Sequence, residues 1–369
     1  MSKRLRLLLA VVGLMLAGVG ASAQPQFHVG PYLQHVTQTS ITIMWETTEP
    51  ADSRVDYGLS AEYGSHAASP EPAKIHTVTL TGLKPDTHYF YRVTSGGLTS
   101  EGATFDTAIP ADKPFRFAVY GDSRSSDPTM CRRVCEAIAK GQPRIVINVG
   151  DVVTNGSEYD QWKTQFLDPA SAFSRTVPLY VAIGNHEQNA HWYYDYVSYP
   201  APENYYAFSY GNSRFVVMDT NQDYAPNSPQ YKWLVAELSS KEAQAAAWLF
   251  AFFHHPPYSE GWDNPSYDGE PLVRRHLVPL LEKCGVDMVF NGHTHDYERG
   301  FMNGVYWIIT GGGGASLDHW VRGFEHIAIS KYVYHYCELD VTARELTLRA
   351  VTPDGQVIDT VTVRRRPVS

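Results

Sequence analysis

From residue 115 onward, apolar strand-like segments alternate with segments of helical pattern, and this alternation constrains the fold more than any other feature of the chain. The strand-like segments include "FRFAVYGDS", "PRIVINVGD", "PLYVAIGNHE", "AAWLFAFFHHPP", "VDMVFNGHTH" and "VYWIITGGGG". Between them lie stretches such as "PTMCRRVCEAIAKG" and "PLVRRHLVPLLEKCG", in which apolar residues recur at helical spacing. Strands that alternate with helices predict an α/β layered domain whose sheet is covered by helices.

Several of these segments end in side chains that can bind a metal ion: Asp122, Asp151, Asn185 with His186, His254, and the pair His293 and His295. Ligands of open α/β sheets bind beyond the carboxyl ends of the strands, so we expect these side chains to lie close together. Asp and Asn often end strands as turn residues, but five polar ends in series are not explained in that way. Oxygen and nitrogen donors without thiolates suit Zn, Mn or Fe. Their number predicts two ions.

Residues 27–107 have a different pattern, with short alternating segments such as "SITIMWETT", "IHTVTLTGL" and "HYFYRVTSG". Glycines and prolines separate these segments, and no helical period is present. The pattern predicts an antiparallel β-sandwich with Trp45 in its core. Residues 108–114, "AIPADKP", have the proline content of a linker. The α/β layered domain is expected over residues 115–337, and residues 338–369 are predicted to complete it as a C-terminal β-hairpin.

The first 23 residues have a basic start, an apolar stretch and small residues before a cleavage site after Ala23, which predicts a signal peptide. Glycines interrupt the apolar stretch, which is short for a membrane span. We therefore expect a secreted or periplasmic protein with no membrane span after cleavage.

The formal net charge is −9, and it becomes more negative when the basic leader is removed. An acidic surface argues against general nucleic-acid binding, which needs basic patches. The four cysteines are too few for a disulfide scaffold, although a bridge between Cys284 and Cys337 stays open.

The ordered set GD, GD, GNH, a His before Pro, and GHxH resembles the calcineurin-like metallophosphoesterases. The run "LTGLKPDTHYFYRV" resembles a fibronectin type III domain, and the combination is most similar to the purple acid phosphatases. The complete set is specific, whereas any one motif would be weak. The resemblance covers residues 27 to about 337 and implies an N-terminal sandwich followed by β-sandwich sheets flanked by helices.

The resemblance also implies a dinuclear metal centre. By that resemblance, Asp122, Asp151 and His295 bind the first ion. Asp151 bridges to the second ion, which Asn185, His254 and His293 also hold.

Asp151 and His186 are the catalytic residues that the resemblance implies. His186 lies outside the coordination sphere and contacts the phosphate or protonates the leaving oxygen. A hydroxide shared by the ions attacks phosphorus in line. Arg124 and His255 are candidate substrate contacts, and an ion pair with Asp122 or Asp127 is the alternative role for Arg124.

Thr154 departs from the purple acid phosphatase pattern, which has a tyrosine three residues after the bridging aspartate. We therefore predict a protein that is not purple and need not use ferric iron; the ions are expected to be Fe, Zn or Mn. The predicted activity is acid phosphatase-like hydrolysis of small phosphate monoesters. A phosphodiesterase, or a non-catalytic surface protein whose N-terminal domain binds an unknown partner, is the alternative. Residues 188–208 and 258–270 are predicted either to wall the cleft or only to pack.

Overall fold

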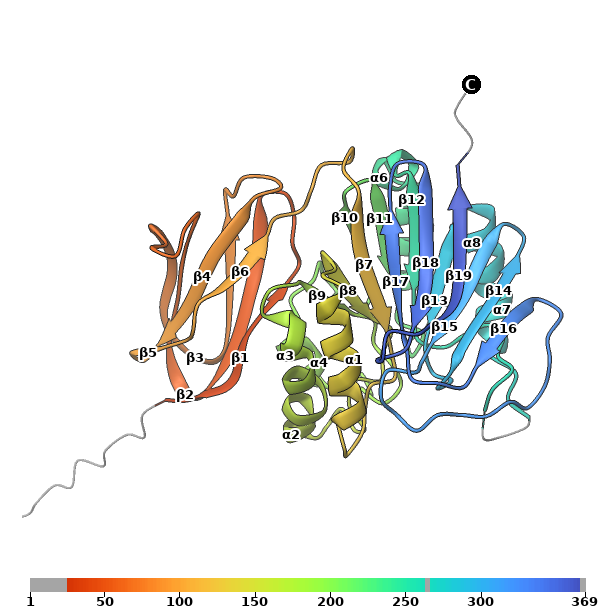
Figure 1. The fold of residues 1–369 in the computed structure, drawn as a ribbon, viewed down its shortest axis with the longest axis horizontal. Coiled ribbons are helices and arrows are strands. Elements are labelled where there is room, and N and C mark those ends of the chain that lie inside the picture. The colour runs from red at the N-terminus through yellow and green to blue at the C-terminus, as the bar shows by residue number, and fades with distance from the viewer. Residues whose placement is uncertain (1–24, 263–265, 366–369) are drawn as a thin grey trace, which may run out of the picture.

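The computed structural model describes residues 25–262 and 266–365, which form a β domain followed by a larger domain of sheets and helices (Figure 1). The predicted signal peptide, residues 1–23, lies outside these described residues. No helix within the described ranges is long and apolar enough to cross a membrane.

The N-terminal domain contains six strands: β1 (Phe27–Gln34), β2 (Ser40–Gly58), β3 (Ser65–Thr81), β4 (His88–Ser95), β5 (Leu98–Thr99) and β6 (Ala103–Asp106). The long strand β2 pairs with β1 before an irregularity near Ala51 and with β4 after it, so the strands close into the predicted β-sandwich. Trp45 is fully buried in the core, as predicted, and its ring stacks on that of His76.

Two sheets form the centre of the second domain. The first has the order β19-β18-β17-β7-β8-β9 and the second has the order β10-β11-β12-β13-β15-β14-β16. The strands of the first sheet are β7 (Phe115–Tyr120), β8 (Ile145–Asn148), β9 (Leu179–Val181), β17 (Tyr336–Val341), β18 (Glu345–Val351) and β19 (Val357–Arg364). Those of the second are β10 (Tyr206–Tyr210), β11 (Ser213–Val217), β12 (Trp248–Phe252), β13 (Met288–Asn291), β14 (Tyr297–Met302), β15 (Val305–Thr310) and β16 (Ile327–Lys331).

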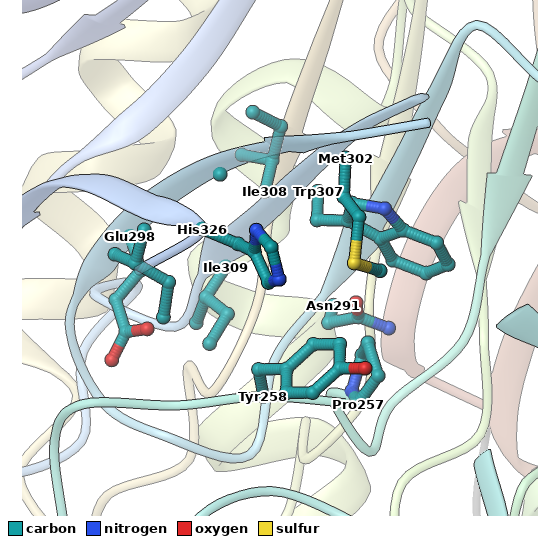
Figure 2. Close-up of a pocket in the computed structure, with 11 residues that line it drawn as sticks. Pro257, Tyr258, Asn291, Glu298, Met302, Trp307, Ile308, Ile309 and His326 are labelled. Atoms are coloured by element: carbon teal, nitrogen blue, oxygen red, sulfur yellow. The ribbon is translucent and has the colours of Figure 1, made fainter. Parts of the chain in front are cut away.

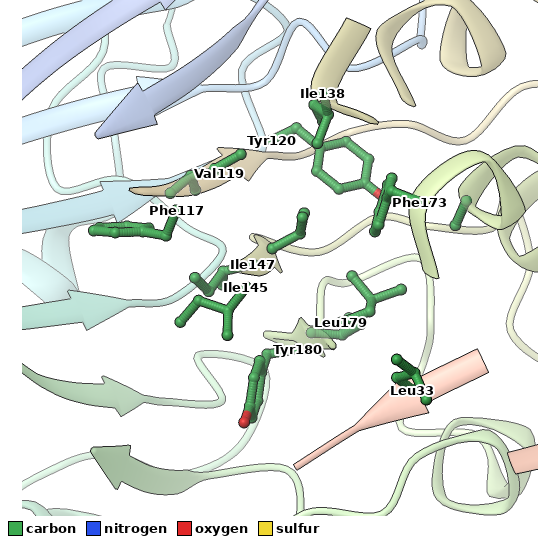
Figure 3. Close-up of a cluster of buried hydrophobic side chains, with 14 of the residues drawn as sticks. Leu33, Phe117, Val119, Tyr120, Ile138, Ile145, Ile147, Phe173, Leu179 and Tyr180 are labelled. Atoms are coloured by element: carbon green, nitrogen blue, oxygen red, sulfur yellow. The ribbon is translucent and has the colours of Figure 1, made fainter. Parts of the chain in front are cut away.

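The two sheets pack face to face through aromatic side chains. Phe117 of β7 contacts Phe215 and Phe250 of the second sheet, with ring centroids 5.2 and 5.1 Å apart. Strands β7, β8 and β9 pair in parallel, and their apolar residues are buried on both faces, as expected for covered parallel strands (Figure 3).

Helices cover the outer faces of both sheets. The segments beside the first sheet are α1 (Thr129–Lys140), α2 (Tyr159–Gln161), a π-helical segment (Trp162–Leu167), α3 (Asp168–Ser174) and α4 (His191–Tyr196). Those against the second are α5 (Pro229–Leu238), α6 (Lys241–Ala245), α7 (Pro271–His276) and α8 (Val278–Lys283). This arrangement confirms the predicted fold class of flanked sheets.

Residues 188–208 pack between the domains. Tyr193 and Tyr196 of α4 are fully buried. The Tyr196 hydroxyl donates to Glu46 Oε2 of the sandwich at 2.7 Å, and the Tyr32 hydroxyl donates to the Tyr196 carbonyl at 2.9 Å. This segment was predicted either to wall the cleft or only to pack, and the structure shows that it packs against the N-terminal domain.

The C-terminal strands extend further than the expected hairpin. Three strands are present, beginning with β17 at Tyr336, and β17 pairs with β7. The tail therefore widens the first sheet, because the edge of β7 opposite β8 offers it hydrogen-bonding groups. All four cysteines are free, so Cys284 and Cys337 form no bridge.

Candidate metal centre

Two buried aspartates follow adjacent parallel strands. Asp122 comes after β7 and Asp151 after β8, and both have a left-handed backbone, with φ of 53° and 55°. Asp tolerates this conformation better than most residues. Ligand atoms of Asp122, Asp151 and His254 all lie within 4.8 Å of one another. The carboxyl ends of β7, β8 and β12 thus meet, as the sequence led us to expect.

Close backbone packing makes this meeting possible. A Cβ atom at Gly292 would lie 2.3 Å from Asp122 Oδ2, and one at Gly311 would lie 2.0 Å from the Thr294 carbonyl oxygen. Only glycine leaves room for both approaches. The glycine run that begins at Gly311 therefore serves packing rather than nucleotide binding, since it also lacks the residues of a P-loop.

His254 has one nitrogen fixed and one available. Its Nδ1 lies 2.9 Å from the Val149 carbonyl oxygen, which can only accept, so Nδ1 carries a proton. Its Nε2 is buried without a hydrogen-bond partner and lies 3.3 Å from Asp151 Oδ1. An imidazole whose second nitrogen donates to a carbonyl is the usual arrangement of a metal ligand. The orphaned Nε2 atom fits a bound cation.

His295 shows the same arrangement on the other side of the cluster. Its Nδ1 donates to the Ser316 carbonyl at 2.6 Å, and its Nε2 lies 3.6 Å from Asp122 Oδ1. His293 and Asn185 face each other, with Nδ1 and Oδ1 3.0 Å apart. The structure thus brings together all six residues predicted as ligands.

The pKa values of the two aspartates shift in opposite directions. Burial raises the pKa of Asp122 well above its usual value. Burial also acts to raise the pKa of Asp151, but the positive charges of His254 and His186 outweigh it and lower that pKa. For His254, burial acts to lower the pKa, and the Asp151 and Asp122 carboxylates outweigh it and raise the value to about 9. The cluster therefore attracts positive charge.

His186 and Thr154 lie at the edge of this cluster. His186 Nδ1 donates to the Thr154 carbonyl at 2.7 Å, and Nε2 lies 3.8 Å from Asp151 Oδ2. The Thr154 hydroxyl donates to Gln165 at 2.9 Å, so this side chain does not turn toward Asp151.

Arg124 lies inside the site, and His255 lies behind it. Arg124 Nε donates to Asp151 Oδ2 at 3.3 Å, and its Nη2 is 3.5 Å from His295 Nε2. Arg124 thus forms an ion pair with Asp151 rather than with Asp122 or Asp127, the partners of its alternative role, because the side chain extends across the cluster. His255 Nδ1 is bonded to Thr220 Oγ1 at 2.8 Å, and its ring packs on that of His293. Burial, with the charge of His254, lowers the pKa of His255 to about 3.

A cavity of about 330 Å³ opens beside the cluster and is lined by Arg124, Asp151, Asn185, His186, Trp262, His293, His295, Ser316, Leu317 and Asp318. His255 is not among these residues, so the structure does not bring it to the cavity. Trp262, from the predicted wall segment 258–270, stacks on His293 with centroids 4.7 Å apart.

Glu187, which the sequence did not single out, supports the backbone around Asp151. Its buried carboxylate accepts hydrogen bonds from the backbone N–H groups of Asp151, Val152 and Gly184, at 2.9, 2.8 and 2.6 Å. The motif "GNHE" contained this residue, but nothing in the sequence showed that its side chain turns inward.

These sheets, with a cluster of metal-binding groups at their strand ends, define a metallophosphoesterase-type domain. Residues 115–297 match the family described as calcineurin-like phosphoesterase, and residues 27–107 match the purple acid phosphatase N-terminal domain. The chain therefore belongs to the calcineurin-like metallophosphoesterases and has the two-domain organisation of purple acid phosphatases. That membership implies a dinuclear metal centre.

Individual relatives agree with this assignment. The chain is 29% identical over 283 residues to purple acid phosphatase 18 of Arabidopsis thaliana. The matched residues make up 70% of this chain and 62% of the relative. It is 28% identical over 266 residues to a nucleotide pyrophosphatase/phosphodiesterase of Hordeum vulgare, covering 60% of this chain and 72% of that protein. A solved purple acid phosphatase from yellow lupin (Lupinus luteus) seeds has the same fold, with a TM-score of 0.82 and 22% identity over 93% of this chain and 75% of that one.

Proposed function

We propose that the protein hydrolyses phosphate esters, with small monoesters as the preferred substrates. The observation that carries this proposal is the convergence of Asp122, Asp151 and His254 within 4.8 Å, with the buried Nε2 of His254 unpartnered. The name of the Arabidopsis relative, a purple acid phosphatase, supports the same reaction class.

In this proposal, Asp122, Asp151 and His295 would hold one metal ion, and Asn185, His254 and His293, with Asp151, would hold a second. Bound ions of the Fe, Zn or Mn type would supply Lewis-acid stabilisation of phosphate charge and activation of water. The carboxylate of Asp151 is well suited to a shared position, because Glu187 fixes its backbone and the His186 N–H donates to its Oδ1 at 3.0 Å.

His186 assists the departure of the alcohol. Its Nδ1 proton is held by the Thr154 carbonyl, so its Nε2 carries a proton only when the ring is charged. In that form Nε2 can donate to a phosphate or leaving-group oxygen in the cavity, which is the role of a general acid. Arg124 adds a fixed positive charge to the cavity wall and can pair with phosphate oxygens.

A phosphodiesterase is the second candidate. The observation that favours it is the Hordeum vulgare relative, whose name is nucleotide pyrophosphatase/phosphodiesterase. A cavity of about 330 Å³ that is open beside Asn185 and Trp262 leaves room for a second substituent on the phosphate.

The deciding assay compares 4-nitrophenyl phosphate with bis(4-nitrophenyl) phosphate, using protein loaded separately with Mn, Zn or Fe. We expect faster turnover of the monoester and a loss of about 10²- to 10⁴-fold in kcat for His186→Ala, whose metal content stays unchanged. Faster turnover of the diester would select the second candidate. No turnover of either ester with metal bound would support a non-catalytic binding protein instead.

The proposal includes a division of the chain and a location. Residues 1–23 act as a cleaved signal peptide, residues 27–107 form the N-terminal domain, residues 108–114 connect it, and the remainder forms the catalytic domain. The basic and apolar pattern before Ala23 supports export to the periplasm or the medium. N-terminal sequencing of the exported protein tests this location, since an intact Met1 would contradict it.

A further inference from the structure

Two buried carboxyl groups lie on the far side of the segment that carries His295. Asp296 is 0% exposed and Glu298 is 1% exposed. Both carboxyl oxygens of Asp296 and the Oε2 atom of Glu298 have no hydrogen-bond partner in the described structure. Buried polar groups are almost always paired, and an orphaned carboxylate calls for an ion or a proton.

The neighbouring loop accounts for only part of Glu298. Its Oε1 atom accepts from Ser259 Oγ at 2.9 Å and from the N–H groups of Glu260 and Gly261 at 2.7 and 3.0 Å. Oε1 is therefore well satisfied, Oε2 has no hydrogen-bond partner, and the carboxyl group of Asp296 lies beside that of Glu298. Glu298 also lines a small apolar cavity, where its carboxyl group turns away from the ring of His326 (Figure 2).

No basic side chain pairs with these two carboxyl groups in the described part of the chain. Arg299, which adjoins Glu298, pairs instead with Asp359 at 2.5 Å. Glu260 adds a third carboxylate nearby, and its oxygens accept from the Phe324 N–H and the Ser330 hydroxyl. The place is thus rich in negative charge and poor in positive charge.

Two hydroxyl groups lie near these carboxyl groups. Thr294 is 0% exposed, and its hydroxyl lies beside the Asp296 carboxyl group, to which it can donate. The buried Tyr332 hydroxyl has no hydrogen-bond partner. A Cβ atom at Gly261 would lie 2.6 Å from Asp296 Oδ2 and 3.0 Å from Tyr332 Cε1, so both side chains surround that glycine.

We propose that Asp296 and Glu298 bind a hard divalent cation, with Ca²⁺ as the occupant, at a site separate from the dinuclear centre. The donors are all oxygen atoms, which Ca²⁺ and Mg²⁺ prefer, and Ca²⁺ accepts a bidentate carboxylate and irregular geometry more readily. One divalent cation neutralises both carboxylates, whereas one shared proton leaves a negative charge buried.

The bound cation has a structural consequence for the cavity. Glu298 holds the Ser259 hydroxyl and the backbone N–H groups of Glu260 and Gly261, and the next residue, Trp262, stacks on His293. Neutralising Glu298 would fix this loop against strand β14. The cation site therefore supports the wall of the cavity, and the proposal does not depend on which phosphate ester is cleaved.

The experiment uses the full mature chain with its dinuclear centre already loaded with Mn or Zn. Ca²⁺ is titrated by calorimetry, and Tm is measured with Ca²⁺ in excess. We expect one additional Ca²⁺ per chain and a rise in Tm of about 3 to 6 °C at about 100 times the dissociation constant. The double variant Asp296→Asn/Glu298→Gln should lose both responses and keep its Mn or Zn content. The matched variant Asp112→Asn/Glu136→Gln, in which both residues are exposed, should keep both responses.

Two results would overturn the proposal. If the double variant binds Ca²⁺ as the wild type does, the ion lies elsewhere. If the two carboxyl groups share a proton instead, Ca²⁺ in excess will leave the Tm of the wild type unchanged. The second measurement needs only the wild type, so it decides the matter even where the double variant does not fold.

Discussion

The Nε2 atom of His254 lies 3.3 Å from Oδ1 of Asp151, while the Nδ1 atom of the same ring donates to the Val149 carbonyl. The imidazole that follows strand β12 therefore lies with its free nitrogen, Nε2, toward the aspartate that follows strand β8. His255, the next residue, bonds to Thr220 instead.

This difference predicts opposite results for two neighbouring variants. His254→Ala should lose about one metal ion per chain and at least about 100-fold in kcat/KM, because removing a direct ligand costs more than the 10- to 100-fold typical of its supporting groups. His255→Ala should keep both ions. Metal analysis by mass spectrometry and an ester assay check the pair, and loss of metal from His255→Ala alone would reverse the assignment.

The affinity for the first ion should depend on His295 more than on any other residue. It is the one imidazole assigned to that ion, and Thr154 turns to Gln165 and cannot replace it. We expect His295→Ala to lose the first ion while retaining the second. A two-site metal titration measures this, and wild-type affinity at both sites in the variant would contradict it.

Glu187 should matter for metal affinity although it is no ligand. Its carboxylate accepts from four backbone N–H groups around Asp151, and an amide in its place would direct an NH₂ group at one of them. Glu187→Gln should therefore lower metal affinity by about 10- to 100-fold. Equilibrium dialysis measures the effect, with Glu158→Gln, at an exposed residue, as the matched control that should show none.

Iron-loaded protein should lack a strong tyrosinate absorption band in the visible range. The side chain at the position of the expected tyrosine is Thr154, and its hydroxyl bonds to Gln165. An absorption spectrum of the ferric protein is sufficient, and a purple colour would show that another tyrosine reaches the metal.

The N-terminal domain should lose stability as the pH falls. Burial lowers the pKa of His76 to about 4, below the ordinary value of about 6.5 for histidine. The unfolded chain therefore takes up a proton that folded His76 resists, so its contribution to stability is full above about pH 6.5 and decreases as the pH falls toward 4. Thermal unfolding of the wild type and of His76→Gln should show a smaller pH dependence in the variant. The exposed residue His66, changed to Gln, is the control, and an unchanged slope in His76→Gln would exclude this cause.

The sequence was informative where the pattern of residue types is typical of one kind of structure. Alternating strands and helices predicted the flanked sheets, and the polar strand ends predicted one cluster, because parallel strands bring their carboxyl ends to one edge. The sequence was less informative about contacts that depend on the direction in which a side chain points. It offered Arg124 as a substrate contact or as an ion-pair partner near Asp122 or Asp127, whereas the side chain pairs with Asp151. It allowed residues 188–208 to wall the cleft, whereas Tyr196 bonds across the domain boundary to Glu46.

By itself, then, the sequence determined the two domain types and the set of metal-binding side chains, since these depend on apolar periodicity and on donor chemistry. Only the tertiary structure decided which donors face one another. His254 and His255 are the same residue type side by side, yet successive side chains along an extended segment point in opposite directions. The buried carboxylates differ as well: Glu187 accepts from the backbone N–H of Asp151, whereas Asp296 and Glu298 lie beside each other without a basic partner among the described residues.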